Sequence, residues 1–172
     1  MNAFQAWLDF LGPAEGVLSM DPNDPGNWTG GRCGDGMLCG SKYGISAAAH
    51  PTLDIAGLTL DQANGIRKTD YWDEMKGDFL PGPVALMAAD AAYMSGPDRA
   101  IMQLQGVLAV APDGILGDKT ISAALAAKPA DFLPKFAAAR LFFLTTLPNW
   151  PRERIGWTLR LFRSVVTALE LA

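Results

Sequence analysis

Large apolar side chains recur at helical spacing along most of this chain. In residues 2–12 they stand three or four positions apart, at Phe4, Trp7, Leu8 and Leu11. This spacing predicts an amphipathic first helix that ends near Gly12 and Pro13. Six further helices are predicted by the same criterion, over residues 59–75, 84–94, 99–110, 120–127, 134–146 and 155–171.

Local signals support two of these helices. Thr59 and Gln62 have the spacing of a capping box, which predicts a helix start at Thr59. The segment 84–94 is very rich in alanine, which indicates a buried central helix. Residues 20–44 are rich in glycine and proline and predict a long structured loop, in which a short hairpin would be the only β-structure. The fold class is therefore mainly α.

The last predicted helix has an apolar stripe formed by Ile155, Leu159, Phe162, Val166 and Leu169. Four arginines accompany it: Arg152, Arg154, Arg160 and Arg163. Such a helix either docks its stripe on the rest of the protein or lies on an anionic membrane surface or lipopolysaccharide. The pattern favours docking, and contact with an outer membrane is the alternative.

Composition limits the classes of function. Of the 172 residues, 49% are hydrophobic and 19% are charged, which is typical of a folded domain. The net charge of −4 argues against nucleic-acid binding. No apolar run approaches the roughly 18 residues that span a bilayer. The N-terminal segment lacks the pattern of a secretory signal, so we expect another route to any extracytoplasmic target.

The two cysteines flank a glycine-rich loop. Cys33 and Cys39 either form a small disulfide in an oxidising compartment or remain reduced thiols. Both interpretations stay open. The chain has a single histidine, His50, so no metal site is expected.

Two carboxyl groups, a hydroxyl and an aromatic ring follow one another early in the chain. Glu15 follows the first predicted helix, Asp24 lies in a turn, and Ser41 and Tyr43 come next. Taken singly, each residue has an ordinary structural role, such as Asx capping for Asp24. Together they suit cleavage of a glycosidic bond, which needs a proton donor and a second group that manages water or positive charge.

A series of short motifs follows in order along the chain. These are Glu15-Gly16, Pro22-Asn23-Asp24-Pro25-Gly26, Tyr43-Gly44-Ile45, Asp70-Tyr71-Trp72-Asp73, Leu80-Pro81, Asp90-Ala91-Ala92-Tyr93, Ser95-Gly96-Pro97, Leu104-Gln105-Gly106 and the segment Asp113 to Thr120. In this order they resemble the glycoside hydrolase family 108 muramidases, which comprise phage endolysins and bacterial secretion-linked lysozymes. The likeness covers roughly residues 5–165. Three features differ from the family pattern. Val17 replaces a glycine, about ten extra residues containing both cysteines precede Ser41, and Met94 stands where an asparagine is common before the Ser-Gly-Pro element.

The resemblance implies roles for particular residues. Glu15 would be the catalytic acid, Asp24 would steady positive charge or help to place water, and the Ser41 hydroxyl would help to hold that water. Glycan contacts would come from Tyr43, Gly44, Asp90 and Tyr93. If the extra residues form an excursion that closes at its base, this geometry survives the insertion.

The resemblance also implies a lysozyme-like catalytic lobe over residues 1–95 and a helical, peptidoglycan-binding-like lobe over residues 96–172 that packs on it. The expected activity is hydrolysis of the β-1,4 bond between N-acetylmuramic acid and N-acetylglucosamine in peptidoglycan, by a monomer without a cofactor. The expected setting is host lysis by a phage endolysin, made in the cytoplasm and released to the periplasm by a holin. A secretion-associated bacterial muramidase, a lytic transglycosylase and a non-catalytic wall-binding protein are the alternatives.

Overall fold

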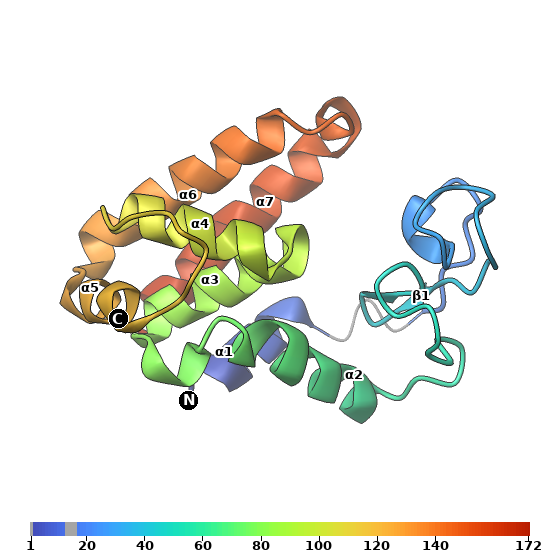
Figure 1. Ribbon diagram of the computed structural model, residues 1–172, viewed down its shortest axis with the longest axis horizontal. Helices are drawn as coiled ribbons and strands as arrows, with labels where there is room; N and C mark the ends of the chain where they lie inside the picture. The colour runs from blue at the N-terminus through green and yellow to red at the C-terminus, as the bar shows by residue number, and fades with distance from the viewer. Residues whose placement is uncertain (1, 13–16) are drawn as a thin grey trace. The chain divides into compact units, whose positions relative to one another are not determined.

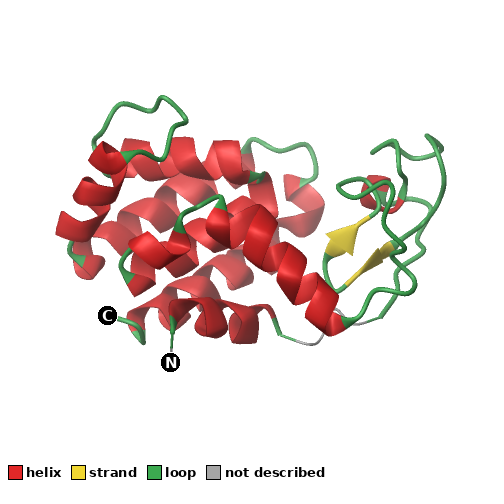
Figure 2. Cartoon of the chain, turned by 60° about the horizontal axis from the view of Figure 1, so that its bottom comes forward, coloured by secondary structure: helices red, strands yellow, loops and turns green. Residues whose placement is uncertain are grey.

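The computed structural model describes residues 2–12 and 17–172, and these residues are mainly α-helical, as the sequence predicts (Figure 2). The backbone forms two compact units. The helical unit comprises residues 1–10 and 67–172, and the loop unit comprises residues 11–66. These units are defined by backbone packing, so the division into a catalytic lobe over 1–95 and a wall-binding lobe over 96–172 stays a prediction.

Helix α3 (Gly82–Ser95) is the centre of the helical unit. Every residue from Pro83 to Ala92 is buried, and α3 packs against α4 (Pro97–Val107), α6 (Pro129–Thr145) and α7 (Trp150–Leu169) (Figure 1). The unit also contains α5 (Asp118–Ala126), the π-helical segment η3 (Lys68–Asp73) and the short helix η4 (Gly77–Phe79). The prediction of a buried central helix over 84–94 is confirmed.

Two predicted helix starts were too late: α7 begins at Trp150 rather than at residue 155, and the second case is α6. The segment predicted over 134–146 belongs to α6, which begins at Pro129 and contains Pro134 within its first two turns. Proline at the first helical position needs no amide hydrogen, whereas Pro134 forgoes one backbone hydrogen bond. Buried Phe132, Leu133 and Phe136 hold this turn in the core and offset that loss.

Helix α1 (Ala3–Leu11) begins in the helical unit, where its aromatic side chains join others from η3 and α3. Trp7 is fully buried, with its ring centroid 6.1 Å from Trp72 and 6.0 Å from Tyr93. Trp72 is buried as well and donates its indole N–H to Asp78 at 2.8 Å. Both tryptophans are core residues of the helical unit.

A buried carboxylate links three helices of this unit. Asp90 of α3 has no exposed surface, and its Oδ2 lies 2.8 Å from Nη1 of Arg140 in α6. Its Oδ1 accepts hydrogen bonds from Nε and Nη2 of Arg160 in α7, at 3.1 and 2.7 Å. Because opposite charges surround the buried carboxylate, α3, α6 and α7 are fixed in one relative rotation.

The apolar stripe of α7 faces outward, so the prediction that it docks on the protein was wrong. Its five residues, Ile155, Leu159, Phe162, Val166 and Leu169, are between 52% and 69% exposed. The buried residues of α7 are instead Leu161, Ser164 and Ala168. The reason is the ion pair of Arg160 with Asp90, which turns the face with the small residues toward α3 and lets the helices approach closely.

A second polar network shapes the loop before α5. Buried Gln105 donates through Nε2 to Oδ1 of Asp113 at 2.7 Å, and its Oε1 accepts the backbone N–H of Gly114 at 3.0 Å. Oδ1 of Asp113 also accepts the N–H of Ile115 at 2.9 Å. These bonds lower the pKa of Asp113, chiefly through the Ile115 amide and then through Gln105.

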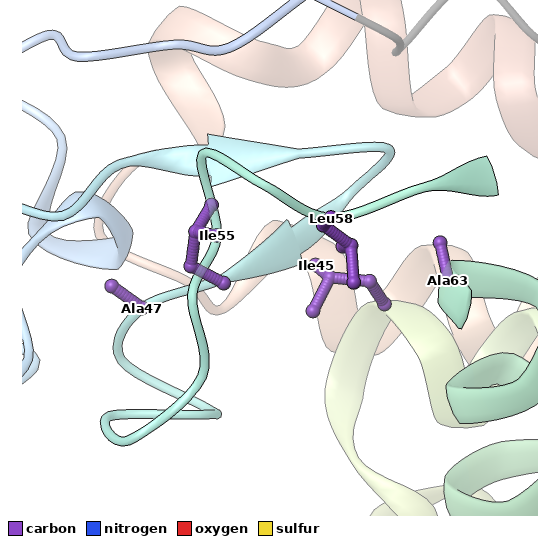
Figure 3. Close-up of a cluster of buried hydrophobic side chains, with 5 residues drawn as sticks. All are labelled: Ile45, Ala47, Ile55, Leu58 and Ala63. Carbon is purple, nitrogen blue, oxygen red and sulfur yellow. The ribbon is translucent and has the colours of Figure 1, made fainter.

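The loop unit is held by a small hydrophobic core. Its buried members are Ile45, Ala47, Ile55, Leu58 and Ala63, whose side chains Figure 3 shows around the short strands. Strands β1 (Ser41–Lys42) and β2 (Ile45–Ser46) form an antiparallel hairpin, and α2 (Leu60–Arg67) follows. The capping box is confirmed. The backbone N–H of Gln62 donates to Oγ1 of Thr59 at 3.2 Å, and the backbone N–H of Thr59 donates to Oε1 of Gln62 at 2.9 Å.

We expect Asp90→Asn to lower the free energy of unfolding by about 3–5 kcal/mol, because it leaves two arginines facing a neutral group in the core. Urea denaturation followed by circular dichroism measures this loss. Asp98→Asn, at an exposed position in the first turn of α4, is the control and should cost less than about 1 kcal/mol. Equal effects of the two variants would contradict the structural role of Asp90.

We expect Asp113→Asn to destabilise the protein at neutral pH but not in acid. The pKa of Asp113 is lower in the folded protein than in the unfolded chain, so its charge stabilises the fold above about pH 4. This stabilisation is lost as the pH falls through the folded pKa. Thermal melts from pH 7 down to about pH 2 should therefore show the wild type and the variant converging. A constant difference across this range would show that the charge contributes nothing.

Candidate functional site

The residues implied in the site fall into three groups. Glu15 lies outside the described residues. Asp24, Ser41, Tyr43 and Gly44 belong to the loop unit, and Asp90 and Tyr93 belong to the helical unit. The structure brings the Asp24 turn and the Ser41 strand together through direct backbone bonds, and these define the geometry of the candidate site.

Asp24 is an exposed carboxylate that its own turn orients. It caps the short helix η2 (Pro25–Asn27), and its Oδ1 accepts the Gly26 N–H at 2.9 Å. Pro25 at the first position of η2 fixes the backbone that follows. The Asx capping expected of Asp24 is confirmed, and the capping bond holds the carboxyl group in one direction.

Ser41 lies on a strand that pairs on both sides. It pairs with Ser46 within the hairpin, and it exchanges both backbone hydrogen bonds with Ser19, at 2.8 and 3.0 Å. Ser19 precedes the Asp24 turn by five residues. The backbone at Ser41 is therefore tied directly to the segment that leads into Asp24.

Tyr43 and Gly44 are the two residues of the hairpin turn. Their φ angles are 53° and 70°, the left-handed conformation at both positions that a type I′ turn requires. Glycine adopts it freely, whereas tyrosine does so rarely. The Tyr43 ring packs against the loop unit's core, and Lys42 Nζ lies 5.4 Å from its centroid. The expected binding of glycan by Tyr43 and Gly44 stays a prediction.

Asn27 is the residue of this site that sequence reasoning missed. It is fully buried, and its Nδ2 donates to the carbonyl of Asp21 at 3.0 Å and to Oγ of Ser19 at 3.4 Å. Its backbone carbonyl oxygen accepts hydrogen bonds from the backbone amides of both Cys39 and Gly40, each at 3.0 Å. An asparagine beside Pro-Gly usually signals an exposed turn, so the local sequence carried no sign of burial.

The extra residues before Ser41 form an excursion that closes at its base. Trp28 pairs with Leu38, and the Thr29 amide donates to the Met37 carbonyl at 2.9 Å. The excursion therefore leaves the chain at Asn27 and returns to it at Cys39. Both cysteine thiols are free, with Cys33 exposed and Cys39 partly buried.

The two implied residues of the helical unit are a core carboxylate and a half-buried ring. The Asp90 carboxylate contacts Arg140 and Arg160 and has no exposed surface, which is the environment of a structural ion pair. Its expected contact with glycan stays a prediction. The Tyr93 ring lies 5.2 Å from Tyr71 and 5.4 Å from the Arg160 guanidinium. Burial, and then the charge of Asp70, raises the pKa of Tyr71 above its usual range, so this phenol stays protonated at neutral pH.

The site chemistry in the described residues is that of carboxylate, hydroxyl and backbone groups. No cluster of histidine, cysteine, aspartate or glutamate in this part of the chain could hold a metal ion. An exposed carboxylate beside a paired strand suits the stabilisation of positive charge or the placement of water. A proton donor must come from another residue, and Glu15 is the candidate that the sequence supplies.

We expect Gly40→Ala to destabilise the protein by at least about 1 kcal/mol more than Gly34→Ala. The two glycines have similar φ angles, 84° and 83°, so the conformational strain of alanine is matched. A Cβ at Gly40 would lie 2.5 Å from the Ser19 carbonyl oxygen, whereas a Cβ at Gly34 has open space. Urea denaturation measures both variants, and equal losses would contradict the close approach at Gly40.

Comparison with known proteins indicates the family of the chain. The model of the family described as Glycosyl hydrolase 108 matches residues 8–96. No curated protein matches the chain. Ten chains of solved structures match, among them the structure of Brucella abortus SagA, with 29% sequence identity and a TM-score of 0.82. That match covers 98% of this chain and 94% of the SagA chain.

Proposed function

We propose that this chain, which belongs to the glycosyl hydrolase 108 family, hydrolyses the β-1,4 bond between N-acetylmuramic acid and N-acetylglucosamine. Family membership makes it a glycoside hydrolase of the lysozyme type, and its substrate class is peptidoglycan. The finer assignment of the bond is our proposal. The observation that carries it is the exposed, oriented Asp24 carboxylate on a turn tied to the Ser41 strand, downstream of Glu15.

In the proposed reaction, Glu15 protonates the leaving glycosidic oxygen. Asp24 steadies the positive charge at the anomeric carbon or helps to place the attacking water, and the Ser41 hydroxyl helps to hold that water. Tyr43, Gly44 and Tyr93 would contact the glycan, since flat rings suit the apolar faces of sugars. The reaction needs no cofactor, because the two carboxyl groups supply the acid and the charge stabilisation.

We expect Glu15→Gln to lower the release of reducing muropeptides from purified sacculi by about a hundredfold or more, because glutamine cannot donate the proton. Asp24→Asn should also lower the rate. Glu153→Gln, at a partly buried acid of α7, is the control and should retain activity. If wild type and Glu15→Gln were equally active, the acid would lie elsewhere in the chain.

The same digestion separates the alternative functions. A hydrolase adds water and leaves a reducing end, whereas a lytic transglycosylase needs one acid and releases an anhydro-sugar that is lighter by one water. Mass spectrometry of the muropeptides distinguishes these products. Binding of sacculi without any cleavage, by wild type and variants alike, would identify a non-catalytic wall-binding protein.

For the biological setting we propose a phage endolysin, a monomer made in the host cytoplasm that reaches the periplasm through a holin. A secretion-associated bacterial muramidase is the second candidate, favoured by the likeness to a protein of the bacterium Brucella abortus. Expression in a Gram-negative host with and without a holin tests the proposal. Lysis that depends on the holin supports the endolysin, and efficient growth with both proteins present contradicts it.

We also propose that α7 can contact the outer membrane. Its apolar stripe is exposed, and Arg152, Arg154 and Arg163 are exposed on the same helix. This combination suits a helix lying on an anionic surface. Among the described residues no helix is long and apolar enough to cross a membrane, so the proposed contact is at the surface. Binding of the wild type and of Phe162→Ser to vesicles that contain lipopolysaccharide tests this proposal. Equal binding by the two would contradict it.

A further inference from the structure

We propose that Asn27 is a positioning residue for the reaction: its buried side chain and backbone hold the Asp24 turn in register with the Ser41 strand. This inference rests on the proposed function and assigns a role to a residue that the family resemblance does not mark. Asn27 would touch neither the glycan nor the reacting water. It would act through the placement of Asp24.

The side chain of Asn27 controls the segment that enters the turn. It has no exposed surface, and its Nδ2 donates to the Asp21 carbonyl at 3.0 Å and more weakly to Oγ of Ser19 at 3.4 Å. These bonds span six and eight residues and close the loop that contains Asp24. A buried amide that lost its acceptors would keep its desolvation cost without compensation, so this closure is strongly favoured.

The backbone of Asn27 controls the other half of the site. Its amide donates to the Asp24 carbonyl at 3.1 Å, and its carbonyl oxygen accepts the amides of Cys39 and Gly40 at 3.0 Å. Gly40 leads directly into β1, which begins at Ser41. One residue therefore contacts the segment before Asp24, Asp24 itself and the segment before Ser41.

The neighbouring bonds leave little freedom for this arrangement to shift. The Gly26 carbonyl accepts the Ala48 amide at 3.0 Å, and the Gly40 carbonyl accepts the Ala47 amide at 3.0 Å. The Asp24 turn and the Ser41 strand are thus both tied to the chain that follows β2. The Asn27 side chain donates to the entering segment, at Ser19 and Asp21, so removal of that side chain should affect Asp24 more than Ser41.

A double-mutant cycle on sacculi tests the proposal, with kcat and KM measured for wild type, Asn27→Ala, Asp24→Asn and the double variant. Asn27→Ala keeps the backbone bonds and should lower kcat about tenfold to a hundredfold, because a small misplacement of a catalytic group costs that much. KM should change by less than about twofold, since uniform glycan binding is retained. In the Asp24→Asn background the same change should cost less than about threefold, because the group that it positions is gone.

Asn23→Ala is the matched control. Asn23 is an exposed asparagine in the same turn, and its Nδ2 donates to Oδ1 of Asp21 at 3.0 Å. Its loss should leave kcat within about twofold of wild type. Thermal melts of every variant ensure that activity is compared where all of them are folded.

Asn27→Asp keeps the shape of the side chain and serves as a second variant. Its carboxylate would face the Asp21 carbonyl, whereas its protonated form can donate to that carbonyl. Its kcat relative to wild type should therefore rise as the pH falls, and burial places this recovery above the usual carboxyl range. If Asn27 contributed only to stability, the kcat of the folded Asn27→Asp variant would not recover as the pH falls.

The outcomes separate this inference from the proposed function. If wild type releases no reducing muropeptides, the proposed function fails and the inference fails with it. If Asp24→Asn is fully active, Asp24 has no role to support and the inference is overturned. If Asp24→Asn loses activity but Asn27→Ala costs the same in both backgrounds, or nothing, the proposed function stands and the inference alone is wrong.

Discussion

Two backbone amide hydrogens converge on the backbone carbonyl oxygen of Asn27. The geometry of the loop unit depends on this junction of two hydrogen bonds at one acceptor. The backbone amides of Cys39 and Gly40 both reach that oxygen at 3.0 Å, which brings residues twelve and thirteen positions apart into contact. A β-sheet would achieve such proximity with a ladder of bonds, but this segment has only strands of two residues. The junction replaces a ladder with one backbone acceptor, whose position the buried Asn27 side chain helps to fix through its bonds to Asp21 and Ser19.

The glycine-rich sequence is what permits this close approach. At Gly40 the backbone passes so near the Ser19 carbonyl that a Cβ would lie 2.5 Å from it. The entropy lost when glycine is ordered is substantial, and the buried cluster around Ile45 and Ile55 offsets part of it. The excursion to Cys33 costs little more, because closure entropy rises slowly with loop length. A catalytic loop can therefore accept an insertion on one side and keep its contacts on the other.

The sequence predicted regular structure better than it predicted the site. Helical spacing located every long helix, and the pair Thr59 and Gln62 located one helix start, because these signals are local. Asp24 was placed in a capping turn for the same reason. The burial of Asn27 and the pairing of Ser19 with Ser41 were missed, because they depend on chain segments that meet only after folding. The early start of α6 was missed because Pro134 alone suggested a boundary.

The outward stripe of α7 shows why amphipathicity alone could not orient that helix. A hydrophobic face buries itself when nothing stronger fixes the rotation of the helix, and that assumption underlies the docking prediction. Here Arg160 meets a carboxylate with no exposed surface, and an unpaired charge in the core costs more than the exposure of a few apolar side chains. Leu161, Ser164 and Ala168 therefore turn inward with Arg160. The hydrophobic pattern identified the helix correctly, but a single polar contact seventy residues away in the sequence decided which face meets the core.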